Sequence, residues 1–201
     1  MQKVLFVKSS LSGDAGQSSQ LLAHFDAQLP ASIERTVIDV VADAKPHLTM
    51  TEMGAWMTDA AQRTAAQTAT EALSSDAIAA VQAADLVVIG VPMYNFAVPS
   101  QLKAWFDRLA RAGITFKYTA QGPVGLLADK PIIFVLTRGG LYQGTPLDSQ
   151  TPYLQAFFNF IGLRNQHFVF AEGLNMGPEA AEKAKTQAKT ELEQLARRFL
   201  I

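Results

Sequence analysis

Three short apolar runs stand out along the chain, and each ends in polar residues or glycine. They cover residues 4–7, 85–90 (DLVVIG) and 131–137 (PIIFVLT). Unbroken runs of this length are typical of strands that are buried on both faces of a parallel sheet. Weaker patterns predict two more strands, one nearer the sheet edge at residues 33–41 and one at residues 167–171.

Between these strands, apolar residues recur at the spacing of helices. The predicted helices are one marked by Leu21, Leu22, Phe25 and Leu29, followed by residues 58–84, 99–112, 152–162 and 178–200. The alanine-rich segment 58–84 contains no Gly or Pro, but a break into two pieces is expected around Ser74 and Ser75. On the helix that starts at Pro99, Lys103 with Asp107 and Asp107 with Arg111 are expected to pair on the outer face.

Strands that alternate with helices predict an α/β fold with a doubly wound, five-stranded parallel sheet of order 2-1-3-4-5. The length of 201 residues fits one domain that spans the whole chain, residues 1–201. In such sheets, ligands bind beyond the carboxyl ends of the strands. The loops after the first, third and fourth predicted strands are therefore where binding chemistry is expected.

Composition excludes several classes of function. Seventeen Lys and Arg against 18 Asp and Glu give a net charge of −1, which offers no basic face for nucleic acid. The absence of cysteine excludes thiol nucleophiles, disulfides and thiolate metal centres, so any redox chemistry must come from a bound group. The three histidines are scattered, which predicts no metal site, and there is no G-x-S-x-G motif of a serine hydrolase.

Hydropathy gives an expectation about location. No apolar run approaches the roughly 18 residues of a membrane span, and the first residues lack the features of a secretory signal peptide. We therefore expect no membrane partner and a cytoplasmic protein.

The loop after the first predicted strand, residues 9–19, is rich in hydroxyl groups and opens a helix. A helix start with free backbone amides and serine hydroxyls can hold a phosphate without Lys or Arg. The alternative is that Ser18 merely caps the helix. The dinucleotide motif G-x-G-x-x-G and the P-loop are both missing, which leaves a mononucleotide, and FMN is the common one on this architecture.

The loops after the third and fourth predicted strands suit a flat ring. Met93 to Phe96 offer apolar surface for stacking, and the side chain of Asn95 can donate and accept hydrogen bonds at the ring's polar margin. Paired glycines at 139 and 140 allow the backbone to approach a planar ligand closely. Each loop also has a simpler explanation, a hydrophobic contact that holds the next helix in the first case and a turn in the second.

Four segments carry a resemblance to a known family. They are KSSL (8–11), VPMYNFAVPSQLKAWFDRLARAGITFKY (91–118), TRGG (137–140) and FVFAEG (168–173), in order along nearly the whole chain. With them the chain resembles the FMN-dependent NADH-azoreductases, which are relatives of the flavodoxin-like NAD(P)H quinone reductases. The segment from Met93 to Tyr118 is the most specific of the four.

The resemblance implies a flavodoxin-like homodimer with one FMN per subunit at the dimer interface. It assigns the ribityl phosphate to Ser10, Gly16, Gln17 and Ser18. The isoalloxazine falls to Met93, Tyr94, Asn95 and Phe96, and its pyrimidine side to Thr137, Arg138, Gly139 and Gly140. Family members often have serine at the position of Gly16, so this residue can contribute only a backbone amide.

The same resemblance places Tyr118 and Phe160 in the substrate pocket, although Phe160 lies in an apolar run that is also typical of a core. Trp56, in the loosely patterned segment 51–57, is expected either to reach over a partner's flavin or to anchor a loop.

The implied activity is reduction of quinones and azo compounds by NADH in a ping-pong sequence through flavin N5, which requires no catalytic acid or base from the protein. The main alternative is a flavodoxin-type electron carrier without NADH oxidase activity. Such carriers are typically strongly acidic, and a net charge of −1 disfavours this reading. A flavin-free binding or regulatory module is the third reading.

Overall fold

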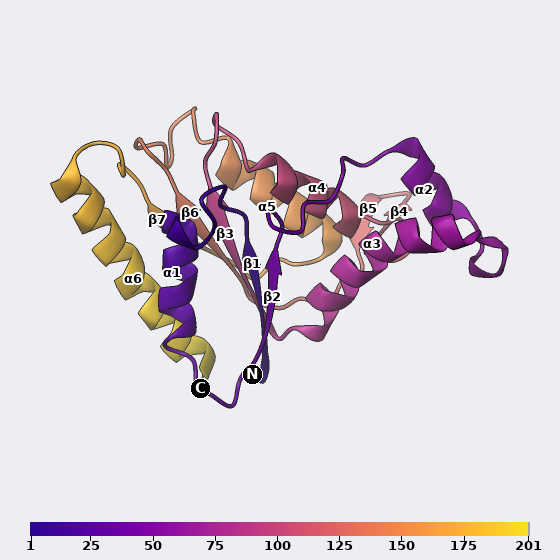
Figure 1. The fold of residues 1–201 in the computed structure, drawn as a ribbon, viewed down its shortest axis with the longest axis horizontal. Helices are drawn as coiled ribbons and strands as arrows, with labels where there is room; N and C mark the ends of the chain where they lie inside the picture. Colours follow the sequence, from indigo (N-terminus) through magenta and orange to yellow (C-terminus); the bar gives the residue numbers. More distant parts are fainter. Residues whose placement is uncertain (201) are drawn as a thin grey trace.

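The structure is a computed structural model that describes residues 1–200. Its central sheet consists of the parallel strands β1 (Lys3–Lys8), β2 (Glu34–Asp39), β3 (Leu86–Pro92), β6 (Ile132–Thr137) and β7 (Gln166–Ala171). Their order is β2-β1-β3-β6-β7 (Figure 1). Counted along the chain within this sheet, that order is 2-1-3-4-5, which confirms the predicted strand order and parallel direction.

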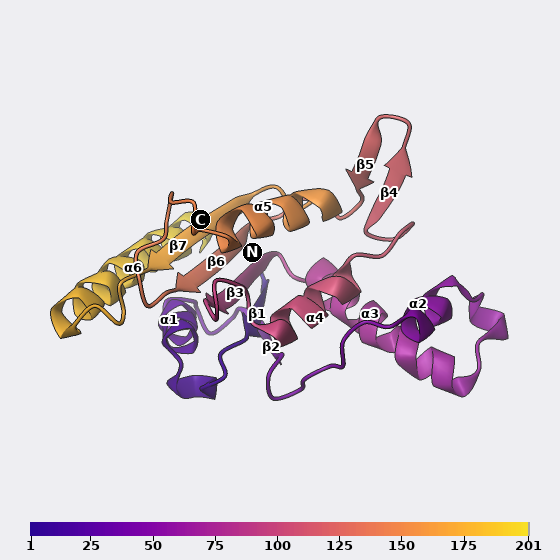
Figure 2. The same cartoon turned by 90° about the horizontal axis from the view of Figure 1, so that it is seen from above.

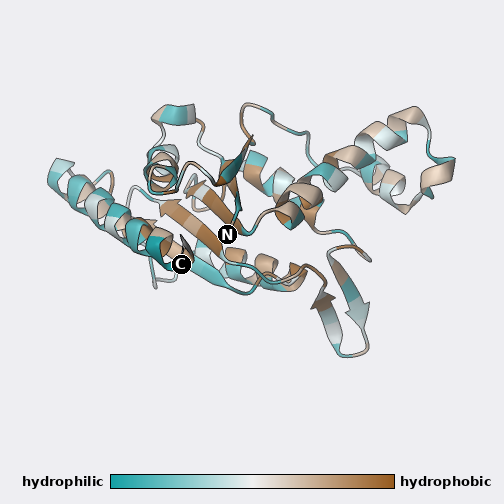
Figure 3. Ribbon diagram, turned by 90° about the horizontal axis from the view of Figure 1, so that it is seen from below, coloured by the Kyte–Doolittle hydropathy of each residue, from teal (hydrophilic) through white to brown (hydrophobic). Residues whose placement is uncertain are grey.

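The apolar residues of the three inner strands pack against helices on both faces of the sheet. On β1, Leu5 and Val7 belong to one core cluster, and Val4 and Phe6 to the other. The residues of β3 and β6 alternate in the same way. Because both faces are buried, these strands need no polar alternation, and Figure 3 shows them as the most hydrophobic part of the ribbon.

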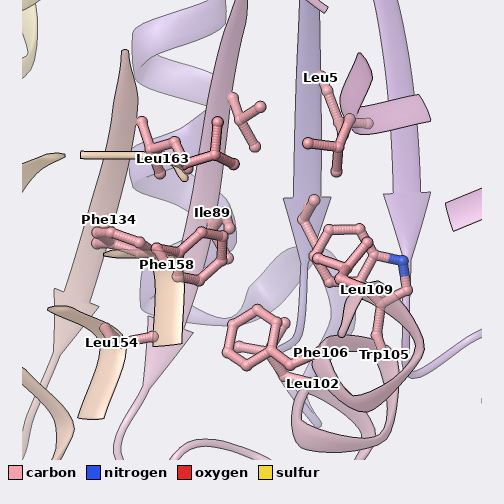
Figure 4. Packing of buried hydrophobic residues seen from close by; sticks show 14 of the residues in the cluster. Leu5, Ile89, Leu102, Trp105, Phe106, Leu109, Phe134, Leu154, Phe158 and Leu163 are labelled. Carbon is pink, nitrogen blue, oxygen red and sulfur yellow. The ribbon is translucent and has the colours of Figure 1, made fainter. Parts of the chain in front are cut away.

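Helices lie on both faces of the sheet (Figures 1 and 2). The helices α1 (Gln17–Asp26) and α6 (Pro178–Leu200) pack on one face. The helices α3 (Ala65–Ala83), α4 (Ser100–Leu109) and α5 (Gln150–Ile161) cover the other. Figure 4 shows this second core, where α4 and α5 present their aromatic and leucine side chains to Leu5, Ile89 and Phe134 of the strands.

The segment between β2 and β3 differs from the prediction. It begins with an unpredicted helix, α2 (Met50–Met57), and continues through the short 3-10 turn η2 (Ala60–Gln62). The following helix α3 starts only at Ala65, where Thr64 and Gln67 form a capping box. It runs through Ser74 and Ser75 without a break, because the buried Ser74 hydroxyl donates a hydrogen bond to the Arg108 carbonyl at 2.7 Å.

The ion pairs on and beside α4 agree with the sequence prediction in part. The predicted pair of Lys103 with Asp107 is present on α4. The predicted pair of Asp107 with Arg111 is wrong, because α4 ends at Leu109 and the helical spacing does not continue. The Arg111 guanidinium instead contacts Glu71 of α3 at 2.5 Å.

A two-stranded antiparallel hairpin, β4 (Phe116–Thr119) with β5 (Gly122–Gly125), was not predicted and lies outside the central sheet. It is attached to the end of α5, where the Leu127 amide donates to the Ile161 carbonyl at 3.1 Å. A Cβ on Gly125 would lie 2.1 Å from the backbone nitrogen of Gly162, so only glycine allows this close contact. Figure 2 shows the hairpin projecting on the side remote from α1 and α6.

The Glu71 carboxylate predicts an acid sensitivity of the folded protein. Burial raises its pKa, but hydrogen bonds from Ser75 and Arg111 outweigh that effect and hold the pKa below the ordinary value of 4.5. A group with a lowered pKa in the folded state binds fewer protons than it does in the unfolded chain. The free energy of unfolding that it contributes is therefore complete above pH 4.5 and is lost as the pH falls through the folded pKa.

We expect Glu71→Gln to be less stable than the wild type at neutral pH and to lose less stability on acidification. Urea titrations at a series of pH values measure both effects. Glu179→Gln, at an exposed position, is the matched control. Stability curves for Glu71→Gln and the wild type that run parallel in acid would contradict the assignment.

Candidate functional site

The loops that follow β1, β3 and β6 meet at the carboxyl edge of the sheet, which we call the rim. The Leu11 amide donates to the Tyr94 hydroxyl at 3.1 Å, and the Ser10 hydroxyl lies 3.5 Å from the same oxygen. The Met93 amide donates to the Thr137 carbonyl at 2.9 Å. These contacts bring together the three loops that the sequence singled out.

The start of α1 presents a set of uncommitted hydrogen-bond donors. Within residues 1–200, the amides of Gln17, Ser18 and Ser19 donate no hydrogen bond, and no side chain caps the helix. The hydroxyls of Ser18 and Ser19 are buried and also lack a partner. Buried polar groups are rarely left unpaired, and a helix start of this kind is suited to an anion.

Gly16 allows the first loop to fold tightly over this helix start. A Cβ at this position would lie 2.0 Å from Oγ and 2.5 Å from Cβ of Ser10. The Ser10 hydroxyl is held there by the Ser12 amide, which donates to it at 3.2 Å. A serine at position 16 therefore has no room in this loop as it is folded.

The loop after β3 begins with a strained turn. The amides and carbonyls of Tyr94 and Ala97 exchange hydrogen bonds of 3.1 and 3.0 Å. Between them, Asn95 and Phe96 both have left-handed backbone angles, with φ of 51° and 63°. Left-handed geometry is unusual for a residue as bulky as phenylalanine, and such outliers cluster at functional sites.

This turn exposes an aromatic surface together with free amides. The side chain of Phe96 is 49% exposed and packs edge-on against Tyr142 at 5.5 Å between ring centroids. The amides of Asn95 and Phe96 make no hydrogen bond within the described chain. A cavity of about 300 Å³ lies against the turn and is lined in part by Phe96, Val98 and Tyr153.

The paired glycines after β6 also present free amides. The Gly139 and Gly140 carbonyls accept hydrogen bonds from the amides of Asn175 and Gly173 at 3.0 and 2.9 Å, while their own amides stay unpaired within residues 1–200. A Cβ on Gly140 would lie 2.8 Å from the ring of Tyr142. A larger residue at position 140 would therefore require the Tyr142 ring to shift.

Arg138 is buried, and residues of its own chain engage its side chain. Its buried guanidinium donates to Asp148 at 2.7 Å, to Glu172 at 2.9 Å, and to Gln150 and Thr151 at 3.1 Å. Its amide and carbonyl are also engaged, with Ala171 and Leu174. These contacts fix the loop after β6 through Arg138, whose assignment to the pyrimidine side of the ring stays a prediction.

The three residues assigned to the substrate lie apart from the rim of their own chain. Phe160, at the end of α5, packs against Phe116 with ring centroids 4.2 Å apart, and Tyr118 on the hairpin is 75% exposed. Trp56 lies on α2 beneath the guanidinium of Arg111, and its buried Nε1 has no partner. Figures 1 and 2 show α2 and the hairpin on the side remote from α1.

Two polar residues of the site were missed by the sequence reading. Ser19 adds a second unpaired hydroxyl at the helix start, and the available signal was the richness of segment 9–19 in hydroxyl groups. Gln150, at the start of α5, could not be recognised from the sequence, because its contacts reach residues more than 50 positions away.

Within residues 1–200, no His, Asp and Glu side chains gather as a metal site, and no helix has the length and hydropathy of a membrane span.

Known proteins share this architecture and sequence. Residues 2–196 match the family described as having a flavodoxin-like fold. FMN-dependent NADH:quinone oxidoreductases of Alteromonas mediterranea and Cellvibrio japonicus are 49% and 50% identical, and the alignments cover 98% and 96% of this chain and 100% and 98% of theirs.

Solved structures give the same result. An azoreductase from Bacillus anthracis is 30% identical with a TM-score of 0.86, covering 98% of this chain and 100% of that one. An FMN-dependent NADH-azoreductase from Bacillus anthracis, solved in complex with FMN, is 26% identical with a TM-score of 0.87, covering 99% of each chain. The resemblance found in the sequence is confirmed, and the chain belongs to the flavodoxin-like family of FMN-dependent NADH:quinone oxidoreductases and azoreductases.

Proposed function

We propose that this chain is a single FMN-binding domain, with a doubly wound sheet, that uses NADH to reduce quinones and azo compounds. The observation that carries the proposal is the set of unpaired buried hydroxyls and free amides at the start of α1, on the same rim as the free amides after β3 and β6. Bound FMN would supply two-electron chemistry between NADH and the acceptor, through N5 and in a ping-pong sequence.

The phosphate of FMN fits the start of α1. The amides of Gln17, Ser18 and Ser19 and the hydroxyls of Ser10 and Ser18 are the donors we assign to it. The positive end of the helix dipole adds to their attraction for an anion. Binding a phosphate here satisfies buried groups that otherwise have no partner.

The isoalloxazine fits between the two other loops. Met93 to Phe96 supply apolar surface and the amides of Asn95 and Phe96, and the Thr137–Gly140 loop supplies the amides of Gly139 and Gly140 on the other side. Backbone donors fixed in place stabilise negative charge that develops at the pyrimidine side on reduction. The chain therefore needs no acid or base to assist the transfer, only donors that hold their positions.

One experiment separates this proposal from the two alternatives. Purified protein loaded with FMN is expected to show a flavin absorption spectrum and to oxidise NADH rapidly when a quinone or an azo dye is present. A yellow protein that does not oxidise NADH would support the electron-carrier reading. A colourless protein that takes up no added FMN would support the third reading, a flavin-free binding or regulatory module.

We propose further that the protein is a homodimer in which each subunit completes the other's site. Tyr118 and Phe160 lie away from the rim of their own chain. Val124 of the hairpin and Leu126, which directly follows it, are 40% and 39% exposed. Aromatic and aliphatic side chains exposed together are typical of a protein interface. In this arrangement Tyr118, Phe160 and Trp56 of the second subunit face the acceptor.

Tyr118→Ala is expected to raise the KM for the quinone by about 3- to 10-fold, because a stacking contact contributes about 0.5–1.5 kcal/mol. The Kd for FMN is expected to stay unchanged, since Tyr118 lies on the acceptor side in this proposal. Tyr118→Phe, which keeps the ring, is the matched control, and light scattering verifies the dimer. An unchanged KM in Tyr118→Ala would contradict the assignment.

A further inference from the structure

Gln150 is a buried amide that connects two of the three rim loops. It is 1% exposed and is the first residue of α5. Its Nε2 donates hydrogen bonds to the carbonyls of Pro92 and Ala97, both at 3.1 Å. Its Oε1 accepts a hydrogen bond from Nε of Arg138, also at 3.1 Å. Both N–H groups and the oxygen of this side chain are thus used.

The two carbonyls bound by Gln150 bracket the strained turn. Pro92 is the last residue of β3, and Ala97 closes the turn that contains Asn95 and Phe96. The neighbouring Ser149 hydroxyl donates to the Phe96 carbonyl within the same turn. The start of α5 therefore holds the left-handed geometry of this turn, which is unfavourable for residues other than glycine.

The network continues from Arg138 to the loop after β6. Arg138 is followed directly by Gly139, and its guanidinium is fixed by Asp148 and Glu172. The Glu172 carboxylate also accepts the amides of Tyr142 and Gln143 at 3.0 and 2.9 Å. One chain of hydrogen bonds thus runs from the turn after β3, through Gln150 and Arg138, to the segment that follows the paired glycines.

We propose that Gln150 is a positioning residue for the isoalloxazine. Through Pro92, Ala97 and Arg138 it sets the spacing between the amides of Asn95 and Phe96 on one side and those of Gly139 and Gly140 on the other. It acts on the ring and not on the phosphate, because its contacts do not extend to the start of α1. This inference rests on the proposed binding of FMN.

The test compares the affinities of the apoprotein for FMN and for riboflavin, measured by flavin fluorescence. Gln150→Leu removes the three hydrogen bonds that join the turn after β3 to Arg138, so both Kd values are expected to rise about tenfold with an unchanged ratio between them. The midpoint potential of the bound FMN is expected to become more negative, since misplaced amides stabilise the reduced form less.

Two further variants distinguish positioning from packing. Gln150→Glu keeps the size of the side chain and the acceptor for Arg138 but loses both donors. We expect it to weaken the binding of FMN and riboflavin as much as Gln150→Leu does. If Gln150→Leu does not fold, Gln150→Glu alone tests the positioning role. Gln155→Leu, at an exposed position of the same helix, is the matched control and is expected to bind both flavins like the wild type.

The inference is overturned if Gln150→Glu binds FMN and riboflavin as tightly as the wild type at an unchanged potential. It is also overturned if only the FMN affinity falls, because that result would place the effect at the phosphate. Failure of the proposed function looks different, since the wild type itself would then bind neither flavin.

Discussion

Replacing Arg138 with methionine is expected to lower the free energy of unfolding by about 3–5 kcal/mol, the usual cost of removing one partner of a buried ion pair. The Arg138 side chain is 0% exposed, and its partners Asp148 and Glu172 are only 8% and 11% exposed. Methionine fills much of the volume but leaves two carboxylates in a poorly solvated site without a cation. The loss of charge pairing therefore dominates over the loss of packing.

Urea denaturation at neutral pH measures this effect, with Arg164→Met at an exposed position as the control. The pH dependence gives a second check. Burial raises the pKa of Asp148, but hydrogen bonds from Arg138 and Thr151 outweigh it and hold the pKa below 3.8. The difference in the free energy of unfolding between wild type and variant is expected to decrease as the pH falls below 3.8. A protonated Asp148 carries no charge, so it is no longer stabilised by the guanidinium. A loss below about 1 kcal/mol would show that the pair is effectively solvated.

The central sheet could be predicted because its inner strands carry their own signal. Residues of β1, β3 and β6 alternate between two cores, so apolar side chains are required at nearly every position. Once the strands alternate with helices, the order of the sheet follows from known connection rules. The edge strand β2 gave a weaker pattern for a physical reason, since its Val37 is 59% exposed.

The elements that were missed bury little of their own surface. In α2 only Glu52 and Ala55 are buried, and Met50 and Met57 are each 73% exposed, so no helical apolar period is visible. The hairpin strands read FKYT and GPVG, and glycine and proline in such short segments are typical of turns. Both elements are held by contacts with distant parts of the chain, which a local pattern does not contain.

The location of the site followed from topology, but the direction of each side chain did not. Loops at the carboxyl ends of neighbouring parallel strands must lie close together, and the sequence placed serine, aromatic and glycine residues there. The resemblance assigned Arg138 to the pyrimidine side of the ring, and the sequence left open whether its side chain assists there or points outward. Its carboxylate partners are 10 and 34 residues away in the chain, so its burial could be recognised only in the folded structure.

Gly16→Ala is expected to weaken FMN binding by about 10- to 100-fold, because overpacking at a tight contact costs about 1–3 kcal/mol. The new methyl group would overlap both Oγ and Cβ of Ser10, at 2.0 and 2.5 Å. Rotation of the Ser10 hydroxyl relieves only the first overlap, so the loop itself must move away from the start of α1. Such a movement separates Ser10 from the amides that we assign to the phosphate.

Riboflavin, which lacks the phosphate, is expected to bind Gly16→Ala nearly as well as it binds the wild type. This selectivity differs from the result expected for Gln150→Leu, which weakens the binding of both flavins equally. The two variants together therefore divide the site into a phosphate part and a ring part. Gly54→Ala is the matched control, because a Cβ on Gly54 meets no atom within 4 Å. If Gly16→Ala weakens the binding of FMN and of riboflavin to the same extent, the start of α1 does not hold the phosphate. The unpaired amides and hydroxyls there then require another ligand.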